Sequence, residues 1–168
     1  MELKKEMTVW GIGGRWLARS LAASVPVIVV AIVFRGPLRA VPVPPWLYCG
    51  AGILLLLVGI PFWFISAVTL KKAYMSETLC TDGVFALCRN PIYAAWILLL
   101  VPGILLFFRN PLLLVIPFIM VALLRGMLSG EETWLEEKYG EAYRDYARRV
   151  PRILPIGACR SAKTSKDS

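Results

Sequence analysis

The sequence contains no histidine, and none of its four cysteines forms a Cys-x-x-Cys pair. A zinc site would need thiolates gathered from scattered positions, so we expect no metal centre. Without histidine, no imidazole can serve as a general base. Free thiols in a reducing compartment are the simpler interpretation of the cysteines.

Charged residues are scarce, at 18% of the 168 residues, whereas hydrophobic residues make up 58%. The mean hydropathy is +0.65, well above that of an ordinary soluble domain. No acidic residue lies inside any long apolar run, so these runs can enter lipid at little cost. The composition therefore excludes a typical soluble protein and predicts a single-domain (residues 1–168) integral membrane protein.

The formal net charge of +8 could indicate a nucleic-acid partner. The distribution of the charges favours the positive-inside rule instead. Four membrane passes would place 16 of the 19 lysines and arginines in the cytosol and three in external loops. We therefore expect cytosolic N- and C-termini, no nucleic-acid partner and a location in a cell inner membrane.

Four apolar segments predict an all-α protein with about four transmembrane helices. The segments are residues 16–34, 46–70, 92–108 and 112–128. Residues 35–45 contain four prolines, which cannot continue a helix, and should form an external loop.

The third and fourth segments have 17 residues each. As helices they would be about 25 Å long, against a hydrocarbon core of about 30 Å. Only Arg109-Asn110-Pro111 lies between them. We expect a short helical hairpin, kinked near Pro102 and near Pro117, that reaches only a shallow depth.

Two polar clusters flank this hairpin. Residues 79–93 precede it and contain the turn signal Asp82-Gly83. Glu131 and Glu132 follow it. We interpret the two clusters as halves of one site at the membrane surface.

An amphipathic helix is predicted for residues 131–149. Leu135, Tyr139, Tyr143, Tyr146 and Val150 follow one another at spacings of four, four, three and four. These spacings place the five side chains on one stripe of a helix that lies on the membrane or caps the hairpin. Pro151 should end this helix, and residues 156–168 should form a disordered tail.

Four motifs follow one another between residues 81 and 155. They are Thr81-x-Gly83-Val84-Phe85, Arg89-Asn90-Pro91-Ile92-Tyr93, Glu131-Glu132-x-x-Leu135-x-x-x-Tyr139-Gly140-x-x-Tyr143-x-x-Tyr146, and Val150-Pro151-Arg152-Ile153-Leu154-Pro155. Their order and spacing resemble the isoprenylcysteine carboxyl methyltransferase and phospholipid methyltransferase family. The resemblance covers about residues 79–155, and it makes residues 71–155 the expected catalytic half. It implies an integral membrane enzyme that uses S-adenosylmethionine and acts on a membrane-embedded or lipophilic acceptor.

The resemblance also implies a set of site residues. The implied cofactor-binding residues are Thr81, Gly83, Val84, Arg89, Asn90, Pro91, Tyr93, Glu131 and Glu132. The Arg89 fork suits the cofactor carboxylate, whereas the glutamates suit its amino group or ribose hydroxyls. Glu131 or Glu132 could act as a base towards an amine or thiol acceptor, and Arg125 could hold an anionic acceptor. The family has histidine where this chain has Asn90, which can form hydrogen bonds but cannot act as a base.

Each assignment has a purely structural alternative. Arg89 could bind lipid phosphate, the glutamate pair could complement a helix N-terminus, and Arg125 could be an interfacial anchor. The functional alternatives are a nicotinamide-dependent membrane reductase, because sterol reductases have a related C-terminal half, and a small membrane adaptor without catalysis. The methyl acceptor and the oligomeric state do not follow from the sequence.

Overall fold

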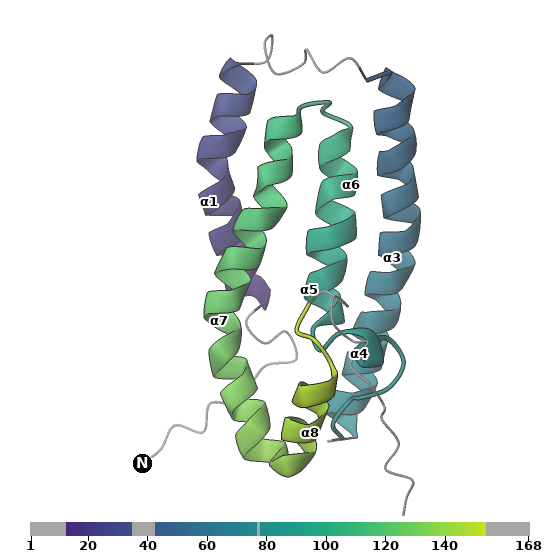
Figure 1. Cartoon of the computed structure of the whole chain (residues 1–168), viewed down its shortest axis with the longest axis vertical. Helices are drawn as coiled ribbons and strands as arrows, with labels where there is room; N and C mark the ends of the chain where they lie inside the picture. Colours follow the sequence, from purple (N-terminus) through teal and green to yellow (C-terminus); the bar gives the residue numbers. More distant parts are fainter. Residues whose placement is uncertain (1–12, 35–42, 77, 154–168) are drawn as a thin grey trace, which may run out of the picture.

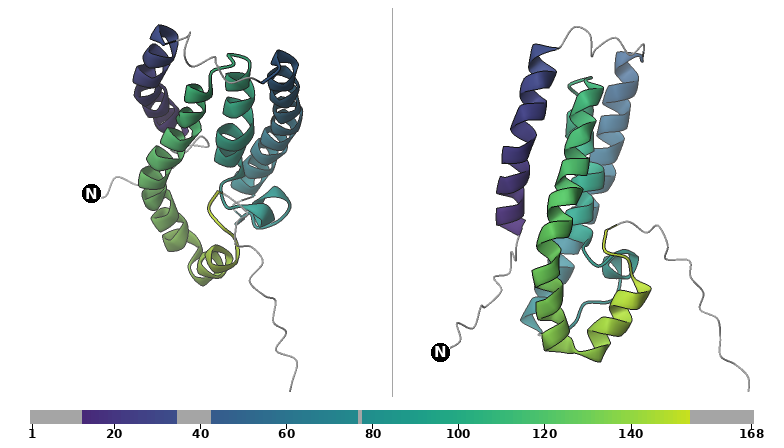
Figure 2. Two further views of the ribbon diagram at one scale, coloured as in Figure 1. Left: turned by 45° about the horizontal axis from the view of Figure 1, so that its top comes forward. Right: turned by 60° about the vertical axis from the view of Figure 1, so that its left-hand side comes forward.

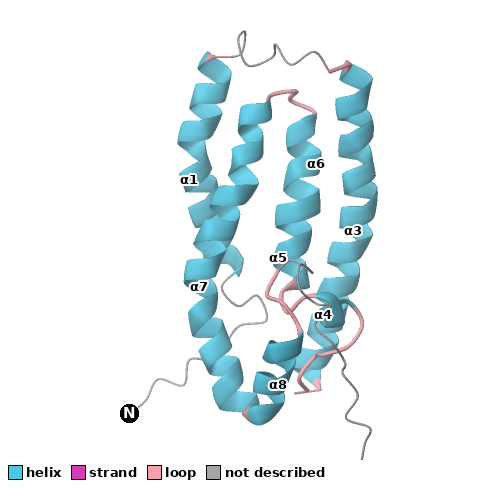
Figure 3. Cartoon of the chain, viewed as in Figure 1, coloured by secondary structure: helices cyan, strands magenta, loops and turns pink. Residues whose placement is uncertain are grey.

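The structure is a computed structural model that describes residues 13–34, 43–76 and 78–153. These residues form helices and connecting loops without any strand (Figure 3). Among the described residues, three helices are long and apolar enough to cross a membrane, and a fourth apolar helical segment is shorter. The protein is therefore an all-α integral membrane protein, as predicted. The predicted tail lies outside the described residues, and so does most of the predicted loop over residues 35–45.

Two long helices flank the bundle (Figure 1). Helix α1 comprises Gly13–Val33, and helix α3 comprises Pro45–Met75. The 31 residues of α3 correspond to about 46 Å, so this helix extends beyond a hydrocarbon core of about 30 Å. It continues past its predicted end at Leu70, because lysine is a good helix former and Lys71-Lys72 does not interrupt it.

The predicted hairpin lies between these two helices (Figure 1). Its first arm consists of α5 (Pro91–Ala95), a π-helical turn η1 (Trp96–Leu100) and α6 (Val101–Leu106). Its second arm consists of a 3₁₀ turn η2 (Pro111–Val115) and α7 (Ile116–Tyr139). The π-helical turn accompanies Pro102, which lacks a backbone N–H group. Pro117 lies in the first turn of α7, directly after the 3₁₀ turn, where its missing N–H group is tolerated.

The prediction that an amphipathic helix begins at residue 131 and runs to residue 149 is wrong about where this helix begins. Helix α7 runs without interruption from the hairpin through Glu131 and Glu132 to Tyr139. The chain then turns at Gly140, whose φ of 57° is readily adopted by glycine. A separate amphipathic helix, α8 (Glu141–Arg149), follows. Both views in Figure 2 place α8, α4 (Val84–Leu87) and the end of α7 at the same end of the bundle.

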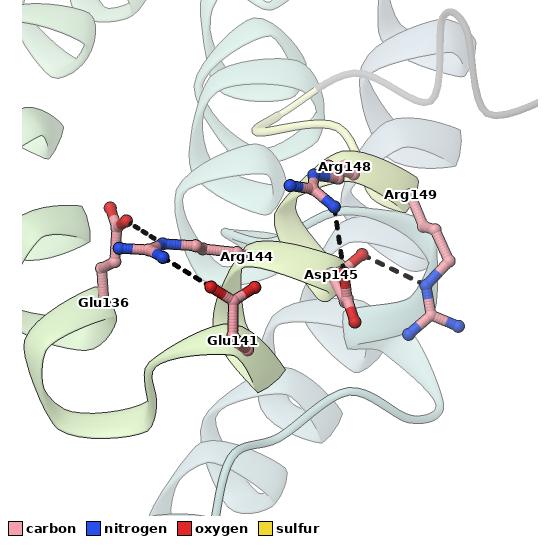
Figure 4. A network of polar contacts seen from close by, with 6 residues as sticks. All are labelled: Glu136, Glu141, Arg144, Asp145, Arg148 and Arg149. Atoms are coloured by element: carbon pink, nitrogen blue, oxygen red, sulfur yellow. Dashed lines mark hydrogen bonds and ion pairs between the residues drawn. The ribbon is translucent and has the colours of Figure 1, made fainter.

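Helix α8 turns two tyrosines inward and its charged residues outward. Tyr143 and Tyr146 are buried. On the outer side, one ion pair joins α7 to α8, and two ion pairs and a hydrogen bond lie within α8 (Figure 4). The residues involved are Glu136, Glu141, Arg144, Asp145, Arg148 and Arg149. Each exposed ion pair contributes only about 0–1 kcal/mol, so the buried tyrosines are the main anchors of α8.

Candidate active site

A cavity of about 360 Å³ lies at the end of the bundle that carries α8. Its walls come from the start of α1, the second half of α3, residues 78–80, the start of the hairpin, the last turns of α7, and α8. This volume is typical of small-molecule sites, which usually have about 300–1,000 Å³. Six separate parts of the chain thus enclose one space.

Aromatic side chains dominate the cavity wall. They are Trp16, Trp63, Tyr74, Phe85, Tyr93, Trp96, Trp134, Tyr139, Tyr143 and Tyr146. Trp16 and Tyr93 meet edge to face, with ring centroids 5.1 Å apart. The indole of Trp16 also donates a hydrogen bond of 3.1 Å to the carbonyl oxygen of Met120. These two contacts hold Trp16 in place, and the ring faces of the wall can attract a cation.

Glu131 brings a carboxylate to this aromatic wall. Its buried Oε2 atom makes no hydrogen bond within the described residues. Burying a carboxylate oxygen without a partner is costly, so its persistence here points to a polar or cationic guest. Two helical turns further along α7, the Lys138 ammonium lies 5.2 Å from the Trp134 ring centroid and 5.3 Å from that of Tyr139.

Arg89 and Glu132 meet behind this wall. Their Nη1 and Oε1 atoms are 3.0 Å apart, and the side chains are only 12% and 15% exposed. Arg89 also donates to the Tyr143 hydroxyl at 3.1 Å. The other Glu132 oxygen accepts a hydrogen bond from Arg152. Arg89 lines the cavity, and its buried Nε atom has no partner among the described residues.

The Tyr143 hydroxyl stays protonated in this setting. Burial raises the pKa of Tyr143, and the Glu132 carboxylate raises it further. Arg89 and Arg152 act in the opposite direction but do not reverse the shift. The hydroxyl can thus accept a hydrogen bond from Arg89 and still donate its own proton.

A short non-helical segment, residues 150–153, fixes the loop that carries Arg89; we name it the strap. The N–H groups of Arg89 and Asn90 donate to the carbonyl oxygens of Pro151 and Arg152 at 2.8 and 3.1 Å. The Asn90 side chain donates to the same Arg152 oxygen at 3.2 Å. Ile153 is buried in the core. Asn90 therefore holds the strap to its loop.

The structure separates the predicted site residues into groups. Arg89, Tyr93 and Glu131 line the cavity, and Glu132 lies behind Arg89. The others lie outside the lining: Asn90 binds the strap, Pro91 is buried at the start of α5, Thr81, Gly83 and Val84 form the turn into α4, and Arg125 is exposed on α7.

Several lining residues were not predicted. Trp134 and Lys138 lie three and seven positions after Glu131, a helical spacing that could have identified them. Trp16 and Trp63 lie in apolar segments without any motif, and only the packing of α1 and α3 brings them to the cavity.

Known proteins resemble this chain over its central part. It is 37% identical to Protein-S-isoprenylcysteine O-methyltransferase of Mus musculus over 82 residues, which are 48% of this chain and 29% of the mouse protein. The Rattus norvegicus protein of the same name has the same identity over the same length, 28% of its own chain. The matched part thus spans less than a third of these relatives. No solved structure matches the chain.

A family model described as phospholipid methyltransferase matches residues 47–142. This range begins in α3 and extends across the hairpin, Arg89, Glu131 and Glu132 into the start of α8. It covers more than half of the 168 residues and agrees with the resemblance carried by the sequence motifs. The chain therefore belongs to the phospholipid methyltransferase family.

Proposed function

We propose that this chain is a methyltransferase that uses S-adenosylmethionine and methylates a lipophilic acceptor at the cytosolic face of a membrane. Family membership supports the reaction type, and the names of the mouse and rat relatives agree with it. The observation that carries the proposal is Glu131, a carboxylate with an unpartnered buried oxygen in a cavity lined by aromatic rings.

The cavity residues fit the cofactor's charges. S-adenosylmethionine supplies an electrophilic methyl group on a positively charged sulfur. Glu131 would bind its amino group, and the free Nε atom of Arg89 would bind its carboxylate. The aromatic wall would pack against the adenine and the sulfonium.

The chain's own contribution is alignment and exclusion of water. Methyl transfer needs these more than it needs acid–base catalysis, which agrees with a chain that has no histidine. For a carboxylate acceptor no proton need be removed. For an amine or thiol acceptor, Glu131 is the carboxylate that lines the cavity and could accept the proton, in place of Glu132. Arg125 lies outside the lining, which favours its alternative role as an interfacial anchor.

The acceptor would reach the cavity from lipid. Both α1 and α3 contribute to the cavity wall, and both expose apolar side chains, such as Leu21 and Phe64. Lys71, Lys72, Arg148 and Arg149 lie on α3 and α8 near the cavity end of the bundle, which the positive-inside rule assigns to the cytosol. Both chain termini and the opening for the cofactor would then face the cytosol of a cell with this protein in its inner membrane.

One experiment tests the proposal against both alternatives. Purified protein in detergent is heated with S-adenosylhomocysteine or with NADPH, and its midpoint of unfolding is measured. Stabilisation by S-adenosylhomocysteine alone supports the methyltransferase. Stabilisation by NADPH alone would support a reductase, and stabilisation by neither would support an adaptor. Incubation with methyl-labelled S-adenosylmethionine and a lipid extract then identifies the acceptor by the product that becomes labelled.

A further inference from the structure

Glu132 is shared between two arginines from distant parts of the chain. Its Oε1 atom is 3.0 Å from Arg89, which lines the cavity. Its Oε2 atom accepts a hydrogen bond from Arg152, which lies in the strap. Arg152 itself is absent from the cavity lining, and its side chain is 46% exposed. The contacts that connect Arg152 to the cavity run through Glu132 and Arg89.

The strap has little freedom to place Arg152 elsewhere. Its backbone accepts three hydrogen bonds from Arg89 and Asn90, at 2.8, 3.1 and 3.2 Å. Ile153, the next residue, is buried, whereas the Arg152 side chain is 46% exposed and pairs with Glu132. Arg152 is thus directed away from the core and towards Glu132.

The charges show what this arrangement achieves. Glu131, with one negative charge, lines the cavity, and Glu132 adds a second. Arg89 and Arg152 balance these two charges, and Lys138 adds a further cation at the cavity wall, over the Trp134 and Tyr139 rings. If Arg152 were neutral, the negative charge of Glu132 would cancel the positive charge of Arg89. The summed charge of Glu131, Glu132 and Arg89 would then be negative. A negatively charged group would then bind poorly beside Arg89.

We propose that Arg152 is a positioning residue that engages half of the Glu132 carboxylate and so leaves Arg89 able to bind the carboxylate of the cofactor. This inference rests on the proposed function, because it assumes a ligand of the S-adenosylmethionine class. The strap thus has a specific role. It supplies a second cation, Arg152, which offsets the charge of Glu132, so that Glu132 does not cancel the positive charge of Arg89.

Two ligands separate this role from simple structural support. S-adenosylhomocysteine carries the carboxylate, and its decarboxylated analogue keeps the amine but lacks the carboxylate. Calorimetric dissociation constants are measured for both ligands with the wild-type protein and with Arg152→Gln. The dissociation constant of S-adenosylhomocysteine should rise roughly threefold to fivefold, the effect expected of a half-exposed ion pair. That of the decarboxylated analogue should change by less than about twofold.

Two further variants complete the test. Arg152→Lys keeps the charge and should restore the wild-type ratio of the two dissociation constants. Arg148→Gln removes an exposed arginine of α8 that pairs with Asp145, and it should change neither constant. Equal weakening of both ligands in Arg152→Gln, with or without a lower unfolding temperature, would overturn the positioning role and leave the proposed function intact. Binding of neither ligand to the wild-type protein would overturn both.

Discussion

The side-chain amide of Asn110 donates a hydrogen bond of 3.1 Å to the carbonyl oxygen of Ala31. Its own oxygen accepts a hydrogen bond of 3.1 Å from the N–H group of Leu112. One buried residue therefore ties the tip of the hairpin to the end of α1 and also caps the 3₁₀ turn that follows. This joint lies at the end of the bundle opposite α8 (Figure 1).

Replacing Asn110 with alanine should lower the free energy of unfolding by about 1–3 kcal/mol, because two hydrogen bonds in a buried site are lost. Reversible unfolding in mixed detergent, followed by circular dichroism, measures the change. Thr133→Val is the matched control, since it removes an exposed hydroxyl whose hydrogen bond stays within α7. Equal stabilities for the two variants would contradict the assigned role of Asn110.

The contact between α3 and α6 depends on two glycines. A Cβ atom on Gly52 would lie 2.8 Å from the backbone oxygen of Gly103, which cannot move without displacing the helix. Gly52→Ala should therefore destabilise the fold by about 1–3 kcal/mol, the usual cost of overpacking. Gly50→Ala, with nothing within 4 Å of the new Cβ, should be neutral or stabilising. A neutral Gly52→Ala variant in the same unfolding assay would exclude this close approach.

The contacts of Asn110 with Ala31 and of Gly52 with Gly103 could not be predicted from the sequence. Hydropathy and the proline positions predict the apolar helices and the hairpin, because burial in lipid depends on composition alone. The motif order predicts that Arg89 and Glu132 lie close together. Which glycine breaks a helix depends on the local backbone conformation: α7 passes through Gly126 and Gly130, and the chain turns at Gly140. Trp16 and Trp63 reach the cavity only through the packing of whole helices, which no local pattern encodes.

Glu131 is the residue whose replacement should affect ligand binding most directly. Glu131→Gln keeps the shape of the side chain but removes the charge facing the cavity, so the dissociation constant of S-adenosylhomocysteine should rise roughly tenfold or more. Glu137→Gln is the control, because it neutralises an exposed glutamate of the same helix that does not line the cavity. Calorimetry at neutral pH measures both. Unchanged affinity in Glu131→Gln would remove Glu131 from the proposed site.

Cys80 offers a chemical probe of the same cavity, which it lines from the loop between α3 and α4. In a variant that retains only Cys80, alkylation by a water-soluble maleimide should slow severalfold when S-adenosylhomocysteine is bound, because the bound ligand would cover the thiol. A variant that retains only Cys49, in the first turns of α3 at the other end of this helix, should show no such protection.

The pH dependence of the same reaction reports the surroundings of Cys80. Burial raises the pKa of its thiol; a backbone hydrogen bond at Asp82 lowers it, and the negative charge of Asp82 raises it again. Because the thiolate is the reactive form, a raised pKa leaves less of it at neutral pH, and labelling should be slower than that of glutathione. The rate should continue to increase above pH 9, where glutathione approaches its plateau. A rate profile that coincides with that of glutathione, together with the absence of ligand protection, would place Cys80 in open water and exclude it from the cavity wall.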